Sequence, residues 1–306
     1  MTTVTNTSGP ASRRAGGLRR NIIGWLFLAP AVGLIGLFTI TPFLQAIELS
    51  FQNWDGVSPD TPWVGLDNYR FVFAYDAFWA SMRNVAFFAI IGFFAGNGIA
   101  LAMAVAVHRI TRGRTFFRTV FYLPGVLSVV VVGLLFSSML APQSGLINNL
   151  LGSLGLESLQ QNWLGDPDIA LPAVAAVFVW FHWGFGFLLF LAGLQDIPAE
   201  PYEAADLDGA GAWVKFRYIT WPHLAPVTTI VSLLTLLAAM QIFGTVQVLT
   251  NGGPGYHTMV PTLLIYGEAF TNHRYGSAAA MSVLFGGALV LLSLLQLGIS
   301  QRRSRA

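Results

Sequence analysis

The segment PAEPYEAADLDGAGAWVKFRYITWP, residues 198–222, is a polar stretch that lies between two long apolar runs. Its two early prolines suit the first turn of a helix, where the N–H groups that proline lacks would have no helical partner. Acids such as Glu203 favour the positive N-terminal end of that helix. Gly209 and Gly211 favour a bend before residues 213–219 resume the helix. The sequence therefore predicts a helix, a bend and a second helix that together form a docking element.

Six residues of this segment stand at a characteristic spacing: Glu203, Ala204, Ala205, Gly209, Ile219 and Pro222. The spacing resembles the cytoplasmic loop of ABC-importer permeases, whose pattern is Glu-Ala-Ala, three residues, Gly, nine residues, Ile, one residue, Leu-Pro. Trp221 stands where that family usually has Leu, so one apolar residue replaces another. Several constrained features at fixed spacing are far more specific than a lone glycine motif. The alternative from the residues alone is an amphipathic linker lying on the membrane surface.

The resemblance implies a set of partners. In that family the loop, here residues 195–224, inserts into a cleft of an ATPase subunit. Glu203 would be the charged anchor against a basic residue of that subunit, and Gly209 would form the bend. The resemblance also implies a second permease subunit, ATP-binding subunits and an extracytoplasmic solute-binding protein. ATP and Mg would be used by the partner ATPase, and this chain would bind no cofactor of its own.

The overall composition points to a membrane protein. The chain has 306 residues, of which 55% are hydrophobic and only 10% charged, and its mean hydropathy is +0.63. These values are far too apolar for an ordinary soluble protein. The absence of cysteine excludes disulfides, thiolate metal sites and cysteine nucleophiles.

Six stretches without Asp, Glu, Lys or Arg are each long enough for a spanning helix, which needs about 20 residues. The predicted spans cover residues 22–44, 84–107, 117–140, 171–194, 225–248 and 276–299. The first apolar run is longer than that of a typical signal peptide and lacks a small-residue cleavage site, so we expect it to be retained. The expected fold class is all-α, a polytopic membrane protein with six transmembrane helices. The resemblance implies the type I ABC importer permease fold.

The basic residues predict the orientation of the chain, because Lys and Arg concentrate on the cytoplasmic side of membrane proteins. An even number of spans puts both termini on one side. Of the 16 Lys and Arg residues, only Arg70, Arg83 and Arg274 fall on the other side. We therefore expect a multi-pass protein of the plasma (inner) membrane with both termini cytoplasmic. Its domain, residues 21–300, would lie between a disordered tail at 1–20 and a short tail at 301–306.

Two further stretches resemble the sugar-permease branch of the same family. They are WVGLDNYRFVFAYDAFWASMRN at residues 63–84 and LTNGGPGYHTMVPTLLIYGEAFTNHRYGSAAAMSV at residues 249–283. The order of elements resembles the first of two permease subunits in carbohydrate importers of the maltose and glycerol-phosphate type. The resemblance thus implies import of a sugar or oligosaccharide across the membrane.

Catalytic motifs are missing from the sequence. The five histidines are scattered, no GxSxG motif is present, and Lys215 does not stand in a phosphate-binding loop. We therefore expect no enzyme activity, no metal site and no nucleic-acid partner. An ion-coupled secondary transporter is the main alternative, but ion coupling usually places ionisable residues within the spans. Apart from Arg118 at the edge of the third, the predicted spans hold no Asp, Glu, Lys or Arg, and His182 is their one mid-membrane titratable residue. A membrane enzyme acting on lipids would also need acids or a histidine cluster.

A path for a sugar needs hydrogen-bonding groups and aromatic faces, because sugars offer hydroxyls around an apolar ring face. The fourth predicted span contains VWFHWGFGF, residues 179–187, and supplies the candidates Trp180, His182 and Phe185. The fifth supplies Gln241. The alternative is that these groups hold helices together or anchor the chain at the membrane interface.

Overall fold

The computed structural model describes residues 27–110 and 112–303. Over these ranges the chain is helical, with a single isolated β-bridge between Gln52 and Trp63. This confirms the predicted all-α class. The tail predicted over residues 1–20 lies outside the described residues, as do residues 304–306 of the second tail.

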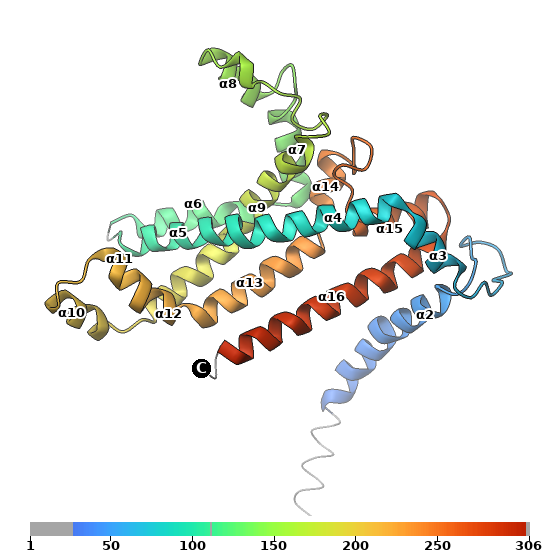
Figure 1. Cartoon of the computed structure of the whole chain (residues 1–306), viewed down its shortest axis with the longest axis horizontal. Coiled ribbons are helices and arrows are strands. Elements are labelled where there is room, and N and C mark those ends of the chain that lie inside the picture. The colour runs from blue at the N-terminus through green and yellow to red at the C-terminus, as the bar shows by residue number, and fades with distance from the viewer. Residues whose placement is uncertain (1–26, 111, 304–306) are drawn as a thin grey trace, which may run out of the picture.

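The described helices follow one another in the order shown in Figure 1. They are η1 Gly36–Ile40, α2 Thr41–Leu49, α3 Asp67–Ala74, α4 Asp76–Ile91, η2 Gly92–Gly96, α5 Asn97–His108, α6 Arg114–Tyr122, η3 Leu123–Val126, α7 Val129–Met139, α8 Leu146–Ser153, η4 Glu157–Leu159, α9 Ala170–Gln195, α10 Glu200–Leu207, α11 Ala212–Lys215, η5 Phe216–Thr220, α12 Trp221–His223, α13 Ala225–Met240, α14 Gly244–Leu249, α15 Pro261–Tyr266, η6 Gly267–Thr271 and α16 Tyr275–Arg303.

Four continuous helices are long and apolar enough to cross a membrane. They are Phe27–Leu49, Asp76–His108, Ala170–Gln195 and Tyr275–Gln296. Two more candidates are bent pairs: α6 and η3 meet α7 at 95°, and the stretch from α11 to α12 meets α13 at 68°. If each bent pair is one span, the described chain has six, in agreement with the predicted number.

Some predicted span boundaries are wrong. The helix that contains the second span begins at Asp76, not at residue 84, because helical geometry continues through polar residues outside the apolar run. The third predicted span, 117–140, is interrupted where Leu127 and Ser128 adopt extended backbone angles just after Pro124. Pro124 cannot donate a backbone N–H, and it lies in the short helix η3, which ends at Val126 just before the break.

Helix α9 is the centre of the fold. Its side chains Phe178, Phe187 and Phe190 are fully buried, and they belong to two successive hydrophobic clusters along the helix. Helix α5 runs alongside α9, and α13 packs against it as well (Figure 1). By contrast, the best apolar window of the first span, Phe27–Leu49, contains no buried residue. The core therefore forms around the fourth span, and the first span lies at its margin.

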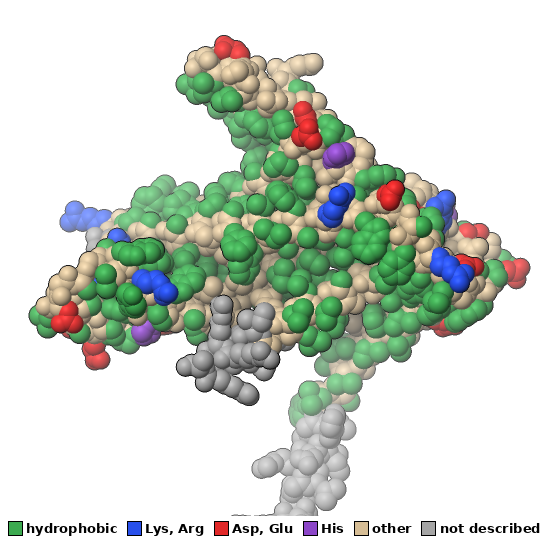
Figure 2. All heavy atoms as spheres, viewed as in Figure 1, with side chains coloured by type: hydrophobic (Ala, Val, Ile, Leu, Met, Phe, Trp, Pro, Cys, Tyr) green, Lys and Arg blue, Asp and Glu red, His purple; other side chains and the backbone are tan. Residues whose placement is uncertain are grey.

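Charged side chains gather at two ends of the molecule. Figure 2 shows red and blue side chains at the end that carries α10 and α11 and around α3, with a largely hydrophobic surface over α5 and α13 between them. Such an apolar surface is suited to lipid, because a bilayer core about 30 Å thick excludes charge. The α10–α11 end and the α3 end thus emerge on opposite sides of the apolar region.

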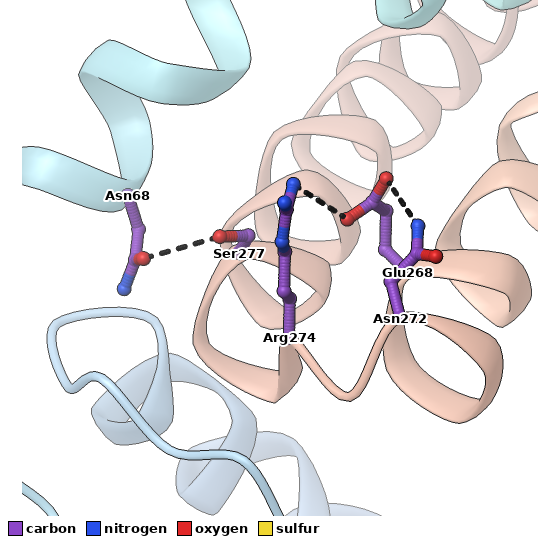
Figure 3. Close-up of polar contacts among 5 residues, drawn as sticks. All are labelled: Asn68, Glu268, Asn272, Arg274 and Ser277. Atoms are coloured by element: carbon purple, nitrogen blue, oxygen red, sulfur yellow. Dashed lines mark hydrogen bonds and ion pairs between the residues drawn. The ribbon is translucent and has the colours of Figure 1, made fainter.

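The α3 end is held together by the polar contacts drawn in Figure 3. The Nδ2 of Asn68 donates to two carbonyl oxygens of the connection after the first span, at 2.9 and 2.8 Å, and its Oδ1 accepts from Ser277 Oγ at 3.3 Å. Glu268 is only 2% exposed; it accepts from Asn272 Nδ2 at 3.1 Å and faces Arg274 Nη1 at 3.8 Å (Figure 3). These contacts join α3, η6 and the start of α16.

Glu268 also influences a neighbouring tyrosine. The pKa of Tyr75 is raised above its ordinary value, first by burial, then by a hydrogen bond with Tyr256 and by the negative charge of Glu268. Tyr75 therefore keeps its proton to a higher pH than an ordinary tyrosine does. Sequence reasoning missed Glu268 because it immediately follows the uncharged stretch 218–267 and so falls outside every predicted span.

A substitution at Gly276 tests how closely α16 packs at this end. A methyl group there would overlap the Gln52 carbonyl oxygen and would stand 2.8 Å from Asn68 Nδ2. Overpacking of this kind typically costs about 1–3 kcal/mol, so Gly276→Ala should lower the melting temperature of the purified chain. Gly286→Ala on the same helix meets no atom within 4 Å and is the matched control. Equal melting temperatures for the two variants would contradict the packing described here.

Candidate coupling site

Helix α10 presents the first part of the spaced pattern to solvent. Pro201 stands in its first turn together with the acids Glu200 and Glu203, which favour the helix N-terminus. Glu203 and Ala204 are exposed, and Ala205 is half-buried. No ion pair within 4.0 Å involves Glu203 among the described residues. The carboxylate is therefore available to a partner.

The turn after α10 depends on Gly209. Its φ is +72°, a left-handed value that glycine adopts without the penalty of a side chain. The N–H of Gly209 donates to the Asp206 carbonyl at 3.1 Å, and that of Ala210 donates to the Ala205 carbonyl at 2.8 Å. This pair of bonds is the Schellman ending of a helix. The chain then re-enters helix at α11, so the predicted helix, bend and helix are confirmed.

Two side-chain contacts hold α10 against the helices that follow it. The hydroxyl groups of Tyr202 and Thr220 are hydrogen-bonded at 2.8 Å, and Thr220 is only 7% exposed. Across the bend, Lys215 forms an ion pair with Asp206. The coupling segment, residues 195–224, is therefore a braced unit and not a loose linker. Sequence analysis did not predict the hydrogen bond or the ion pair. The bonded residues are 18 and nine positions apart, and no helical repeat of the sequence connects them.

The second half of the pattern continues directly into the membrane helices. Ile219 is half-buried in η5, and Pro222 is exposed in the first turn of α12. Leu224, the next buried residue, is fully covered and belongs to the same hydrophobic cluster as α9. A Cβ at Gly193 of α9 would lie 3.1 Å from the side chain of Leu224, the N-cap residue of α13. Helix α9 and the start of α13 are therefore in close contact here. Displacement of the coupling segment would therefore be passed to α9 and α13.

The four candidates for a substrate path have different local surroundings, and their role in a path stays a prediction. Trp180 packs edge-on against Phe136, with ring centroids 5.1 Å apart. His182 lies against Phe178 at 4.2 Å, and its Nδ1 is 2.9 Å from the carbonyl oxygen of the same residue. Phe185, by contrast, is 51% exposed. These contacts fit helix packing better than a shared binding cavity.

Gln241 occupies a different environment from the predicted one. The fifth predicted span, 225–248, is interrupted: α13 ends at Met240, and Gln241 is exposed at its C-terminal cap before α14 begins. The Ile242 carbonyl in this break accepts a hydrogen bond from Thr262 Oγ1 at 2.5 Å. This bond from another segment replaces one that the helix would have made. The expectation of one continuous helix over residues 225–248 was therefore wrong, and a role for Gln241 in a substrate path stays a prediction.

The tie between Tyr202 and Thr220 can be tested by a double-mutant cycle. Tyr202→Phe and Thr220→Val should each lower the melting midpoint of the purified chain by about 2–4 °C, since a net hydrogen bond contributes about 1 kcal/mol. The double variant should lose little more than either single variant, because both changes remove the same bond. Tyr218→Phe, at a ring that is 73% exposed, is the control. Fully additive losses would contradict the bond.

The described residues contain no group of three His, Asp or Glu side chains that could hold a metal ion. The coupling segment offers features suited to recognition: the exposed carboxylates of Glu200 and Glu203 on α10, neither of which forms an ion pair among the described residues, small residues beside Glu203, and a connection into the core. Such a surface can bind a protein and transmit its movement.

Comparison with known proteins identifies the family. The model for "Binding-protein-dependent transport system inner membrane component" matches residues 96–305. A probable ABC transporter permease protein of Bacillus subtilis, YurN, is 35% identical over 281 residues, with coverage of 91% of this chain and 96% of that protein. The diacetylchitobiose uptake system permease protein NgcF of Streptomyces coelicolor is 34% identical, with coverage of 88% and 79%. The sn-glycerol-3-phosphate transport system permease protein UgpA of Agrobacterium fabrum is 31% identical, with coverage of 92% and 96%.

A solved structure has the same fold. It is the crystal structure of a bacterial ABC transporter involved in the import of the acidic polysaccharide alginate, with a TM-score of 0.82 and 23% identity over 95% of this chain and 99% of that chain. At this identity the likeness concerns the fold alone. The family match covers well over half of the sequence and agrees with relatives more than 30% identical. The chain belongs to the binding-protein-dependent transport system inner membrane components, the permease family that the spacing from Glu203 to Pro222 predicted.

Proposed function

We propose that this chain is the transmembrane permease subunit of an ATP-driven importer that moves a sugar or oligosaccharide across the plasma membrane. The observation that carries the proposal is the braced coupling segment, whose exposed Glu203 stands on a helix tied to η5 at 2.8 Å. Relatives named for diacetylchitobiose, for sn-glycerol-3-phosphate and for multiple sugars support a carbohydrate or related polyol as cargo. The ion-coupled alternative is not favoured, because other relatives, among them YurN, are named as probable ABC transporter permease proteins.

In this proposal the energy comes from a partner. An ATP-binding subunit, using ATP and Mg, would receive α10 in a cleft and pair one of its basic residues with Glu203. The coupling segment and both termini would then be cytoplasmic. The basic residues support this orientation, since Arg109 and Lys215 line the same space together with Tyr202 of α10 and Ala212 of α11.

The mechanism follows from the connection between the coupling segment and the core. ATP binding would close the ATPase subunits and displace α10. Because Tyr202 is bonded to Thr220 and Leu224 is buried against α9, the displacement would reach α9 and α13 together. Movement of these two helices would open the path alternately to each side. This transfer needs a rigid segment. The hydrogen bond between Tyr202 and Thr220 and the ion pair between Asp206 and Lys215 supply that rigidity.

The two remaining partners would occupy other surfaces. A second permease subunit would cover the first span, Phe27–Leu49, whose best apolar window has no buried residue within this chain. A solute-binding protein would dock on the α3 end, opposite the coupling segment. Its presence is supported by a structural relative crystallised with an alginate pentasaccharide-bound periplasmic protein, with a TM-score of 0.83.

Transport in proteoliposomes tests the proposal. The complex purified with its neighbouring gene products should accumulate labelled sugar only when ATP is on the side of the coupling segment and binding protein is on the other side. A panel of mono-, di- and oligosaccharides identifies the cargo. Accumulation driven by a proton gradient without ATP would contradict the proposal and favour the secondary-transporter alternative.

A further inference from the structure

Two adjoining cavities lie beside the coupling segment, between α5 and α11. One has a volume of about 360 Å³ and the other about 520 Å³. They share four lining residues, Val105, Arg109, Ala212 and Phe216, so together they form one continuous depression. The function proposed above uses neither of them.

The larger cavity is an apolar trough along one face of α5. Gly98, Leu101, Ala102, Val105 and Arg109 line it, and their offsets of 0, 3, 4, 7 and 11 residues place them on a single helix face. At 1.5 Å per residue, the 11 steps from residue 98 to residue 109 span roughly 16 Å. One leaflet of a bilayer core is about 15 Å thick, half of the usual 30 Å. The trough therefore has the length of one acyl chain.

Aromatic side chains form the opposite wall. Trp213 and Phe216 are stacked, with ring centroids 5.7 Å apart and an interplanar angle of 26°. Trp213 is 72% exposed although it lies next to a membrane helix. Tryptophan is favoured at the level of the lipid headgroups, because its ring is amphipathic. We therefore expect Trp213 and Phe216 to lie at the level where the acyl chains of a lipid join its headgroup.

The smaller cavity places positive charge at the end of the trough. Arg109 lines both cavities, and Lys215 lines the smaller one. Lys215 is already paired with Asp206, but among the described residues no carboxylate lies within ion-pair distance of Arg109. The hydroxyl-bearing residues Tyr202 and Thr220 line the same space. The cations and hydroxyl groups at the end of the trough are suited to an anionic lipid headgroup, and the apolar trough is suited to an acyl chain of the same lipid.

We propose that this depression binds one anionic glycerophospholipid of the leaflet on the coupling side. Its phosphate would contact Arg109 and approach Lys215, and one acyl chain would lie along α5 from residue 105 to residue 98. The trough belongs to the candidate span Asp76–His108, so a bilayer surrounds it unless another protein does. Bound there, the lipid bridges α5 and α11. The proposal concerns lipid binding alone and is independent of ATPase docking.

Native mass spectrometry of the purified full-length chain tests the headgroup contact. We expect phosphatidylglycerol to be retained at least about fivefold better than phosphatidylcholine with the same acyl chains, since one basic residue near a lipid surface is worth about a factor of five. Arg109→Gln should abolish this preference. Arg118→Gln, which removes an equally exposed charge from α6 that lines neither cavity, should keep it. Equal losses in both variants would show diffuse attraction and overturn the site.

Photo-cross-linking from position 102 tests the trough and identifies its occupant. A photoreactive amino acid in place of Ala102, in the assembled complex in native membranes, should form adducts with phospholipid. Adducts with a second permease or with an ATP-binding subunit would overturn the proposal. Ala102→Trp, which fills the trough and leaves Arg109 in place, should reduce phosphatidylglycerol retention to the level of phosphatidylcholine. Unchanged retention in that variant would also overturn it.

Discussion

Glu203→Lys is expected to reduce ATP-driven uptake about 30-fold or more while the chain still inserts into the membrane. Glu203 is exposed on α10 and has no ion-pair partner among the described residues, so its replacement breaks no ion pair there. In the proposed complex its carboxylate meets a basic residue in a desolvated cleft. Disrupting a buried interfacial charge pair costs about 2–5 kcal/mol, and each 1.4 kcal/mol is a factor of ten.

Glu200→Lys is the matched control for this variant. Glu200 stands one turn earlier on the same helix and is likewise an acid in its first turn, so both variants lose the same favourable interaction with the helix dipole. Only Glu203 belongs to the coupling pattern. Uptake should therefore remain close to wild type in Glu200→Lys. If both variants import sugar normally, Glu203 is not the anchor.

Gly209→Pro is expected to abolish coupling altogether. Proline fixes φ near −65°, whereas Gly209 has a φ of +72°. The variant would also lose the hydrogen bond from Gly209 N–H to the Asp206 carbonyl, which is 3.1 Å long. The turn can then no longer place α10 beside α11, and the ion pair between Asp206 and Lys215 is lost with it. We expect uptake at background level and little ATPase retained on the purified complex.

Gly211→Pro tests whether the backbone conformation at residue 209 causes this loss. Gly211 has a φ of −68°, which is the value that a proline ring imposes, and a Cβ there meets no atom within 4 Å. Uptake by Gly211→Pro should be affected far less than uptake by Gly209→Pro. Membrane insertion of both variants can be checked by the amount of protein extracted from washed membranes. Similar uptake in the two variants would show that the left-handed turn is not required.

The sequence predicted the elements that depend on local composition. The fourth span was expected over residues 171–194, and α9 covers Ala170–Gln195. Charged residues flank this helix at both ends, and all of its faces are apolar. A count of uncharged residues therefore locates it well. The bend at Gly209 was also predictable, because a left-handed turn has a strong residue preference.

What the sequence did not predict depends on contacts between distant segments. The break after Met240 is stabilised by Thr262, which is 20 residues from the Ile242 carbonyl that it bonds. The 95° bend of the third span reorients α7 toward its neighbour α14, and no count of apolar residues encodes a direction. Within the aromatic run of residues 179–187, successive residues of a helix point about 100° apart, so Trp180 packs against Phe136 whereas His182 packs against Phe178.

The central claim is that α10 contacts an ATP-binding subunit, and cross-linking from this helix tests it most directly. The chain contains no cysteine, so a single introduced cysteine carries the only attachment point for a photoreactive probe on this subunit. Ala204→Cys places the probe beside Glu203, and Val57→Cys, which replaces a residue 85% exposed on the opposite side of the apolar region, is the control. In the purified complex we predict cross-links to the ATP-binding subunit from position 204 and none from position 57. A complex that contains the subunit but gives no such cross-link from position 204 would contradict the account.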